Sequence, residues 1–323
     1  MARRPPAADA AAAPTPRGWT AGELARLEAF LASLRNERRL SGHTAAAYRR
    51  DLDAFVRFCA AQGVTRFDAV GEPHVRAFAA HAHRAGLAPR SIQRCLSALR
   101  TFFRFLIREG ALTHSPAVEV RAPKSARRLP AALDVDRMAR LLDGPAPVAA
   151  DAALEARDRA IVELFYSSGL RLAELVGLDL AALDLADRTV RVHGKGGKTR
   201  IVPVGGPAIA ALGSWLGLRA ALAPPGERAV FVGRGGRRLG VRAVQLRVEA
   251  WARQRGLDVR VHPHLFRHSF ATHLLESSHD LRGVQELLGH ANISTTQVYT
   301  HLDFQHLARI YDAAHPRARR RAR

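Results

Sequence analysis

The sequence predicts a mostly α-helical protein with a small antiparallel β-sheet, organised as two domains. Apolar residues recur every three or four positions through most of the 323-residue chain, which is the helical period. One segment alternates with period two instead, and a proline-rich basic segment separates the two halves. The predicted parts are an Ala/Pro-rich disordered tail (1–19), a helical domain (20–111), a basic linker (112–132), a larger domain (133–316) and a basic tail (317–323).

The first domain is predicted to consist of four helices. Thr20 is followed three residues later by Glu23, a capping-box pattern that marks the start of a helix. A proline opens the fourth helix and Gly110 closes it. The helices are expected from Thr20, from near Thr44, over 72–84 and over 89–109.

The second domain is predicted to combine helices with one β-hairpin. TVRVHGKGGKTRIVPV (189–204) places two alternating stretches on either side of a Gly-rich turn, a hairpin pattern. Helices are expected near 134–142 and 153–168, from Arg171, over 206–222 and 241–255, and in HPHLFRHSFATHLL, DLRGVQELLGH and FQHLARIYDAAH.

The charge of the chain points to a polyanionic partner. Lysine and arginine number 50 against 29 acidic residues, a net charge of +21. Such a positive field attracts nucleic acid, so double-stranded DNA is the expected partner. On the fourth helix, phosphate contact is predicted for a row of arginines opposite the apolar face, although a merely solvated face is the alternative: Arg90, Arg94, Arg100 and Arg104.

Composition argues against several other classes of protein. Cys59 and Cys95 lie among apolar residues, so buried free thiols are expected rather than disulfides or metal ligands. No apolar run reaches the ~20 residues of a membrane span, and the N-terminus lacks the core of a signal peptide, so we expect a cytoplasmic protein without membrane insertion. The histidines of HPHLFRHSFATH lack the HExxH pattern, so no metal site is predicted.

Six polar residues of the second domain together suit phosphodiester chemistry: Arg171, Lys195, His264, Arg267, His290 and Tyr299. Guanidinium groups can each bind two non-bridging phosphate oxygens, and a phenol is easier to deprotonate than an alcohol. An aryl phosphodiester keeps the energy of the cut bond, so rejoining needs no ATP. The residues alone leave open whether the six meet in space, and for Tyr299 a packed core tyrosine is the alternative.

Four segments that contain these residues resemble the signature segments of the tyrosine recombinases, also called the λ-integrase family: SGLRLAELVGL, HGKGGKTRIVPV, HPHLFRHSFATHLL and LLGHANISTTQVYTH. The family pattern of Arg, Lys, His-x-x-Arg, His and Tyr falls on all six residues. The x-x-Arg spacing selects His264 rather than His262. Within the family the chain is similar to the Xer recombinases, and its C-terminal part resembles the XerC branch rather than the XerD branch.

The resemblance implies a site-specific recombinase that uses neither metal nor cofactor. Tyr299 is the implied nucleophile, which leaves a 3′-phosphotyrosyl link and a free 5′-hydroxyl, and strand exchange passes through a Holliday junction. The implied partners are a XerD-like recombinase in a heterotetramer and a septal DNA translocase of the FtsK type. The implied outcome is resolution of chromosome dimers at cell division, in the cytoplasm at the nucleoid. Glu174 is expected to orient an active-site donor, or else to be a helix-surface carboxylate.

Three alternatives stay open at this point. They are a mobile-element integrase, an enzyme like the type IB topoisomerases, and a non-catalytic architectural DNA-binding protein. The helical first domain argues against the topoisomerase. The complete set of six residues argues against the architectural protein, because binding alone needs no nucleophile.

Overall fold

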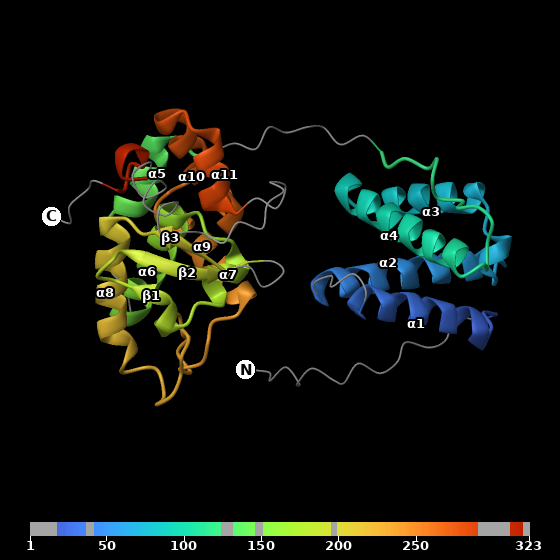
Figure 1. Ribbon diagram of the computed structural model, residues 1–323, viewed down its shortest axis with the longest axis horizontal. Helices are drawn as coiled ribbons and strands as arrows, with labels where there is room; N and C mark the ends of the chain where they lie inside the picture. The colour runs from blue at the N-terminus through green and yellow to red at the C-terminus, as the bar shows by residue number, and fades with distance from the viewer. Residues whose placement is uncertain are drawn as a thin grey trace. The chain divides into compact units, whose positions relative to one another are not determined.

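The computed structural model describes residues 18–36, 42–123, 132–145, 151–194, 199–289 and 311–318. The chain divides into two compact units between Arg128 and Leu129, inside the predicted linker. Helices dominate both units, and the three-stranded antiparallel sheet belongs to the second (Figure 1). The predicted fold class is therefore confirmed.

The first unit is built from four amphipathic helices. Prolines occupy the first turns of the last two helices, where the missing N–H costs nothing. The buried ring of Phe55 lies edge-on to Phe78 and Phe103, with centroids 5.2 and 6.3 Å away. The helices are α1 (Ala21–Asn36), α2 (Gly42–Ala61), α3 (Glu72–Arg84) and α4 (Pro89–Arg108), with a short 3-10 turn η1 (Phe67–Ala69).

The beginning of the predicted linker packs on the first unit. Ala117 and Val120 are buried in its core, because Arg100 holds this stretch by donating hydrogen bonds to both of their carbonyls. The packed chain therefore continues to Val120, beyond the predicted end of the first domain. The rest of the linker prediction, over 124–131, lies outside the described residues.

Both cysteines are buried free thiols, as predicted. Cys59 lies on α2 and Cys95 on α4, within the same core. Burial raises the pKa of each thiol to about 12. Both therefore stay protonated at neutral pH and serve as small apolar side chains.

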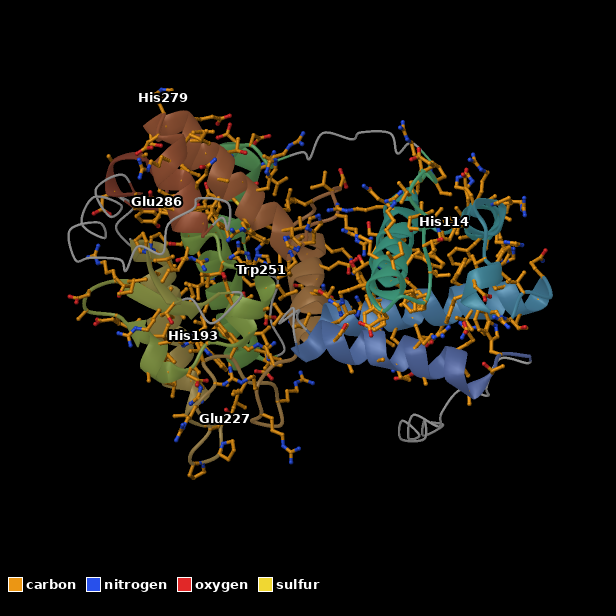
Figure 2. The ribbon with its side chains drawn as sticks, turned by 45° about the vertical axis from the view of Figure 1, so that its right-hand side comes forward. His114, His193, Glu227, Trp251, His279 and Glu286 are labelled. Carbon is orange, nitrogen blue, oxygen red and sulfur yellow. The ribbon has the colours of Figure 1, made fainter. Side chains whose placement is uncertain are left out.

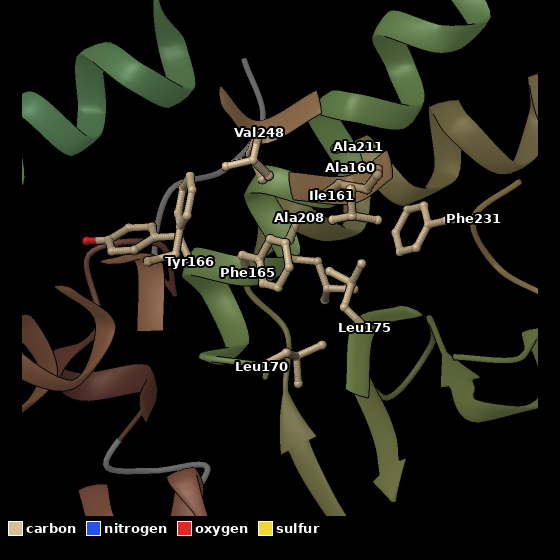
Figure 3. Close-up of a cluster of buried hydrophobic side chains, with 14 of the residues drawn as sticks. Ala160, Ile161, Phe165, Tyr166, Leu170, Leu175, Ala208, Ala211, Phe231 and Val248 are labelled. Atoms are coloured by element: carbon tan, nitrogen blue, oxygen red, sulfur yellow. The ribbon is translucent and has the colours of Figure 1, made fainter. Parts of the chain in front are cut away.

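The second unit is built around one buried helix, α6. Ile161 and Phe165 of α6 point into a cluster that includes Leu170 and Leu175 (Figure 3). The helices α8, α9 and α10 all pack against α6. The elements are α5 (Val135–Asp143), α6 (Ala152–Ser168), α7 (Leu172–Val176), η2 (Leu180–Ala182), β1 (Leu183–Asp184), β2 (Thr189–His193), β3 (Thr199–Pro203), α8 (Gly206–Arg219), α9 (Val241–Gln254), α10 (Pro263–Ser278) and α11 (Leu281–Leu288).

The predicted hairpin is present as β2 and β3. The two strands pair antiparallel, with Val190 opposite Val202 and Val192 opposite Arg200. All four of these side chains are buried, so this face of the sheet meets the core. The hairpin tip, 195–198, lies outside the described residues. The strand β1, which the sequence did not predict, adds a short third strand beside β2.

The described C-terminal segment, 311–318, packs on its own domain. The Tyr311 hydroxyl lies 2.8 Å from Oγ of Ser167 on α6, and the His315 ring stacks on Tyr311 with centroids 4.8 Å apart. Nearby, Nδ1 of the buried His273 lies 2.9 Å from the Tyr166 hydroxyl, so this histidine packs and hydrogen-bonds within the domain.

We predict that Phe55→Ala destabilises the first unit by about 3–5 kcal/mol, because it removes a fully buried ring. The two units have separate hydrophobic clusters, so amide hydrogen exchange should accelerate on α2, α3 and α4 while α6 keeps its protection. If Phe55→Ala accelerated amide exchange equally in both units, the two hydrophobic cores would not be independent. Phe165→Ala is the matched control, with the reverse pattern expected.

Candidate active site

Two predicted arginines from distant parts of the chain meet at the end of one helix. Arg171 stands just before α7, and Arg267 lies one turn into α10. Nη2 of Arg171 donates to the carbonyl of Gly289 at 2.9 Å, and Nη2 of Arg267 donates to the carbonyl of Leu288 at 2.6 Å. These adjacent carbonyls close α11, where the helix dipole favours positive charge. The fold therefore brings Arg171 and Arg267 together across 96 residues of sequence.

The local backbone explains how Arg171 and Arg267 reach each other. Helix α6 ends at Gly169 with a φ of +55°, and a Cβ there would lie 2.6 Å from the Phe270 ring. Only glycine fits this close approach in a left-handed conformation. The Gly169 carbonyl then accepts a hydrogen bond from Nη1 of Arg267 at 2.7 Å. The turn between α6 and α7 thus accepts a hydrogen bond from Arg267 and also contains Arg171.

Arg267 remains cationic in spite of its burial. Burial lowers the pKa of Arg267 to about 10, with a further contribution from the positive charge of Arg171 beside it. A pKa near 10 leaves the guanidinium protonated at neutral pH. The lowered value indicates a cation that an incoming anion would stabilise.

Glu174 is the carboxylate that joins Arg171 to a third arginine, Arg200. Its Oε1 accepts from Nη1 of Arg171 at 2.9 Å, and its Oε2 accepts from the backbone N–H of Arg171 at 2.8 Å. Arg200 adds two more hydrogen bonds, to Oε1 at 2.8 Å and to Oε2 at 2.9 Å. Burial acts to raise the pKa of Glu174, but Arg200 and Arg171 outweigh it and hold the pKa below its ordinary value. Glu174 is buried, so the alternative of a helix-surface carboxylate is wrong, and its bonds to Arg171 fit the predicted orienting role.

Arg200 is a site residue that the sequence did not indicate. It lies on β3, and only 7% of its side chain is exposed. It lies within the segment HGKGGKTRIVPV but is not one of the six pattern residues, and an arginine in an alternating strand is ordinarily taken for an outward residue. The strand pairing places Arg200 opposite Val192 on the buried face of the hairpin, and this pairing would have identified Arg200 as an inward-facing residue.

His264 lies one turn before Arg267, in the first turn of α10, and is exposed. Its ring centroid is 6.5 Å from that of His262. Nδ1 of His262 accepts the backbone N–H of Leu265 at 3.2 Å and so caps the helix. Burial, together with His264, lowers the pKa of His262. The geometry gives His262 a structural role and leaves His264 exposed, one turn from Arg267.

Three of the six predicted residues, Lys195, His290 and Tyr299, lie outside the described residues. The described chain on either side gives their context. In the sequence, Lys195 lies between β2, which ends at His193 (labelled in Figure 2), and β3, which begins at Thr199. His290 directly follows Gly289, the residue whose carbonyl Arg171 holds.

The described part of the site carries more positive than negative charge. Of three guanidinium groups, those of Arg171 and Arg200 bind the one carboxylate, Glu174, and that of Arg267 binds only backbone carbonyls among the described residues. The described residues take up two of the five N–H groups of Arg171 and two of those of Arg267. The arrangement is suited to an anion that accepts several hydrogen bonds.

The four arginines of α4 differ in their surroundings. Arg94 forms a bidentate pair with the buried Asp51, with both distances 2.8 Å, and Arg100 holds the carbonyls of Ala117 and Val120. Arg104 donates to the carbonyl of Arg100 at 3.3 Å and is exposed, as is Arg90. Arg94 and Arg100 thus have structural partners, and DNA contact by the four stays a prediction.

Comparison with known proteins places the chain in a family. The model described as "Phage integrase family" matches residues 132–306, more than half of the chain. The model described as "Phage integrase, N-terminal SAM-like domain" matches residues 27–110. The chain belongs to the phage integrase family. It is thus a tyrosine recombinase, a site-specific DNA recombinase enzyme.

The recombinase has relatives that resemble it along nearly its whole length. It is 55% identical over 295 residues to a tyrosine recombinase XerC of Pseudomonas entomophila, covering 91% of this chain and 97% of the relative. It is 57% identical over 297 residues to a tyrosine recombinase XerC of Azotobacter vinelandii, covering 92% and 98%. The predicted similarity to the Xer type is confirmed.

Solved structures agree with this recombinase in fold. A XerH site-specific recombinase bound to a palindromic difH substrate in a post-cleavage complex has a TM-score of 0.67 at 24% identity, covering 90% of this chain and 86% of that one. A Tn1549 transposon integrase in complex with circular intermediate DNA also has a TM-score of 0.67, at 17% identity, covering 87% and 98%. At these identities the likeness concerns the fold alone.

No helix in the described part of the recombinase has the length and apolarity to cross a membrane. No group of three or more His, Cys, Asp or Glu side chains in the same part of the chain is arranged to hold a metal ion.

We predict that Glu174→Gln lowers the free energy of unfolding at pH 7 by about 3–5 kcal/mol, because it breaks a buried ion pair. The folded-state pKa of Glu174 is lowered, so its stabilising effect is complete above the unfolded-state pKa, near 4.3, and is lost as pH falls through the folded-state pKa. The stability difference between the two proteins, measured by urea unfolding, should therefore narrow below about pH 4.3. A difference independent of pH would show that Glu174 is not the titrating partner.

Proposed function

We propose that this recombinase cuts and rejoins one DNA strand at a time, with Tyr299 as the nucleophile. The phenolic oxygen of Tyr299 attacks the phosphorus, and the bond from phosphorus to the 5′ oxygen breaks. The products are a 3′-phosphotyrosyl link and a free 5′-hydroxyl. The reverse attack by a 5′-hydroxyl restores the phosphodiester and releases the tyrosine, so the bond count is conserved and no ATP is consumed.

The paired arginines carry this proposal. Arg171 and Arg267 are both fixed by backbone carbonyls, and each keeps N–H groups beyond those taken by described residues. In the proposed reaction they bind the non-bridging oxygens of the phosphate, whose negative charge grows in the transition state. Because the guanidinium groups are already held in place, little reorganisation is needed when the charge develops.

The other three residues transfer protons in this proposal. His264 or His290 accepts the Tyr299 proton, or else holds the phosphate. Lys195 protonates the departing 5′ oxygen, provided that neighbouring cations lower its pKa. The exposed position of His264, one turn from Arg267, supports access to a bound duplex.

We further propose that the biological reaction is the resolution of chromosome dimers at cell division. Identities of 55% and 57% to proteins named XerC, over more than nine-tenths of the chain, support this choice over a mobile-element integrase. The proposed assembly is a heterotetramer with a XerD-like recombinase, controlled by an FtsK-type DNA translocase. It acts on chromosomal DNA, and therefore in the cytoplasm at the nucleoid.

We predict that Tyr299→Phe abolishes covalent DNA capture and preserves DNA binding, because only the attacking oxygen is removed. The substrate is a nicked duplex that carries the genomic site found by footprinting, with the partner recombinase present. The wild-type protein should form an adduct stable to denaturing electrophoresis, without added metal or ATP. Adducts formed through the Phe variant itself would identify a different nucleophile.

We predict that Arg171→Lys lowers the rate of adduct formation by about 100-fold or more, since an ammonium cannot reproduce the guanidinium fork. The rate is measured at saturating DNA so that binding does not limit it. Arg188→Lys, in the turn before β2, is the control and should keep the wild-type rate. Wild-type cleavage by Arg171→Lys would argue against the proposed phosphate clamp.

A further inference from the structure

We propose that Arg200 is a positioning residue for the cleavage reaction: it holds Glu174 and the end of α11 in the places that orient Arg171 and Arg267. The inference rests on the proposed function. Arg200 is only 7% exposed, compared with 37% for Arg171, so it lies behind the arginines that would meet DNA. It acts through its neighbours and touches no reacting atom.

One planar guanidinium joins three elements of the second unit. Nη1 and Nη2 of Arg200 bind the two oxygens of Glu174 on α7, and Nε donates to the carbonyl of Leu287 on α11 at 3.2 Å. The backbone of Arg200 is itself fixed in β3, opposite Val192. The sheet, α7 and α11 therefore have a common anchor in this side chain.

The partners of Arg200 are also the partners of the arginine pair. Three successive carbonyls at the end of α11 each accept from a different arginine: Leu287 from Arg200, Leu288 from Arg267, and Gly289 from Arg171. A shift of α11 would move both carbonyls that fix Arg171 and Arg267. Arg200 is the most deeply buried of the three arginines, and it secures the helix end from inside the domain.

Arg200 also determines how Glu174 holds Arg171. The carboxylate binds both the side chain and the backbone N–H of Arg171, which requires a fixed orientation. Two parallel hydrogen bonds from Arg200 supply that orientation. Without them, Glu174 would keep Arg171 as its described cationic partner and would be free to rotate with it.

The space around Arg200 is closely fitted to a guanidinium. A Cβ on Gly289 would lie 3.3 Å from Cδ, Nε and Nη1 of Arg200, and Gly289 has a φ of +64°. A lysine has one ammonium on a flexible stem and cannot bind both Glu174 oxygens and the Leu287 carbonyl in this geometry. The site therefore requires arginine at position 200 rather than a positive charge alone.

The test compares Arg200→Lys and Arg200→Met with the wild-type protein in the nicked-duplex assay, with the partner recombinase present. Both variants should bind the duplex with wild-type affinity and form adducts about 100-fold more slowly at saturating DNA, the scale expected when a catalytic group is displaced by about 1 Å. Such a split between binding and rate is not expected from a loss of stability alone.

Arg219→Met is the matched control for the loss of a buried arginine. Arg219 is 8% exposed and binds the backbone carbonyls of Ala229 and Glu227, so its removal should lower thermal stability much as the removal of Arg200 does. At a temperature where all variants are folded, Arg219→Met should cleave at the wild-type rate. A parallel loss of cleavage in Arg219→Met and Arg200→Met would reduce the role of Arg200 to stability and overturn the inference.

A double-mutant cycle tests whether Arg200 acts through Glu174. Glu174→Gln and Arg200→Met should each slow cleavage, and the double variant should be no slower than the slower single variant. If the fold-losses in cleavage rate of the two single variants multiplied in the double variant, Arg200 and Glu174 would act independently. If Arg200→Lys cleaves at the wild-type rate, the inference alone fails; if the wild-type protein forms no adduct, the proposed function fails and the inference falls with it.

Discussion

The site depends on keeping three guanidinium groups close together in a partly dry environment. Two unit charges about 5 Å apart repel by roughly 3 kcal/mol at an effective dielectric of 20, so such a cluster opposes folding unless something offsets it. The described structure supplies two compensations: the carboxylate of Glu174 and the carbonyl end of α11. Together these groups hold the arginines in place, but one carboxylate does not neutralise three positive charges. The remaining positive charge is available to a phosphate, and the pKa of Arg267 is lowered by burial first and by the charge of Arg171 second.

This imbalance links the folding of the domain to its chemistry. A phosphoryl transition state gains negative charge on its non-bridging oxygens, and donors fixed beforehand stabilise that charge without moving. The energy needed to assemble the donors is supplied by the apolar core around α6, since α7, α10 and the sheet all pack against that core. The core therefore does more than stabilise the domain, because it keeps like charges close together before any DNA arrives.

Much of this architecture is visible in the sequence, because helical periodicity, prolines at helix starts and one Gly-rich turn are local signals. The site is harder to predict where a side chain binds a residue far away in the sequence. In β3, Ile201 is exposed and Arg200 is buried, the reverse of what hydropathy indicates. Arg200 is buried because it binds Glu174, which lies 26 residues earlier and is not evident from the strand itself. The arginine row of α4 shows the same effect: Arg94 is held by Asp51, 43 residues earlier, which periodicity on a single helix does not reveal.

The six-residue pattern identifies the chemistry, but residues outside the pattern set its geometry. Arg171 and Arg267 take their positions from Glu174, from the carbonyls that end α11, and from Gly169, whose left-handed φ allows α6 to stop against Phe270. A chain could carry all six residues and still hold its arginines in the wrong place if β3 did not supply the inward Arg200. A six-residue match therefore points to transesterification, and the supporting residues decide how well a given chain performs it.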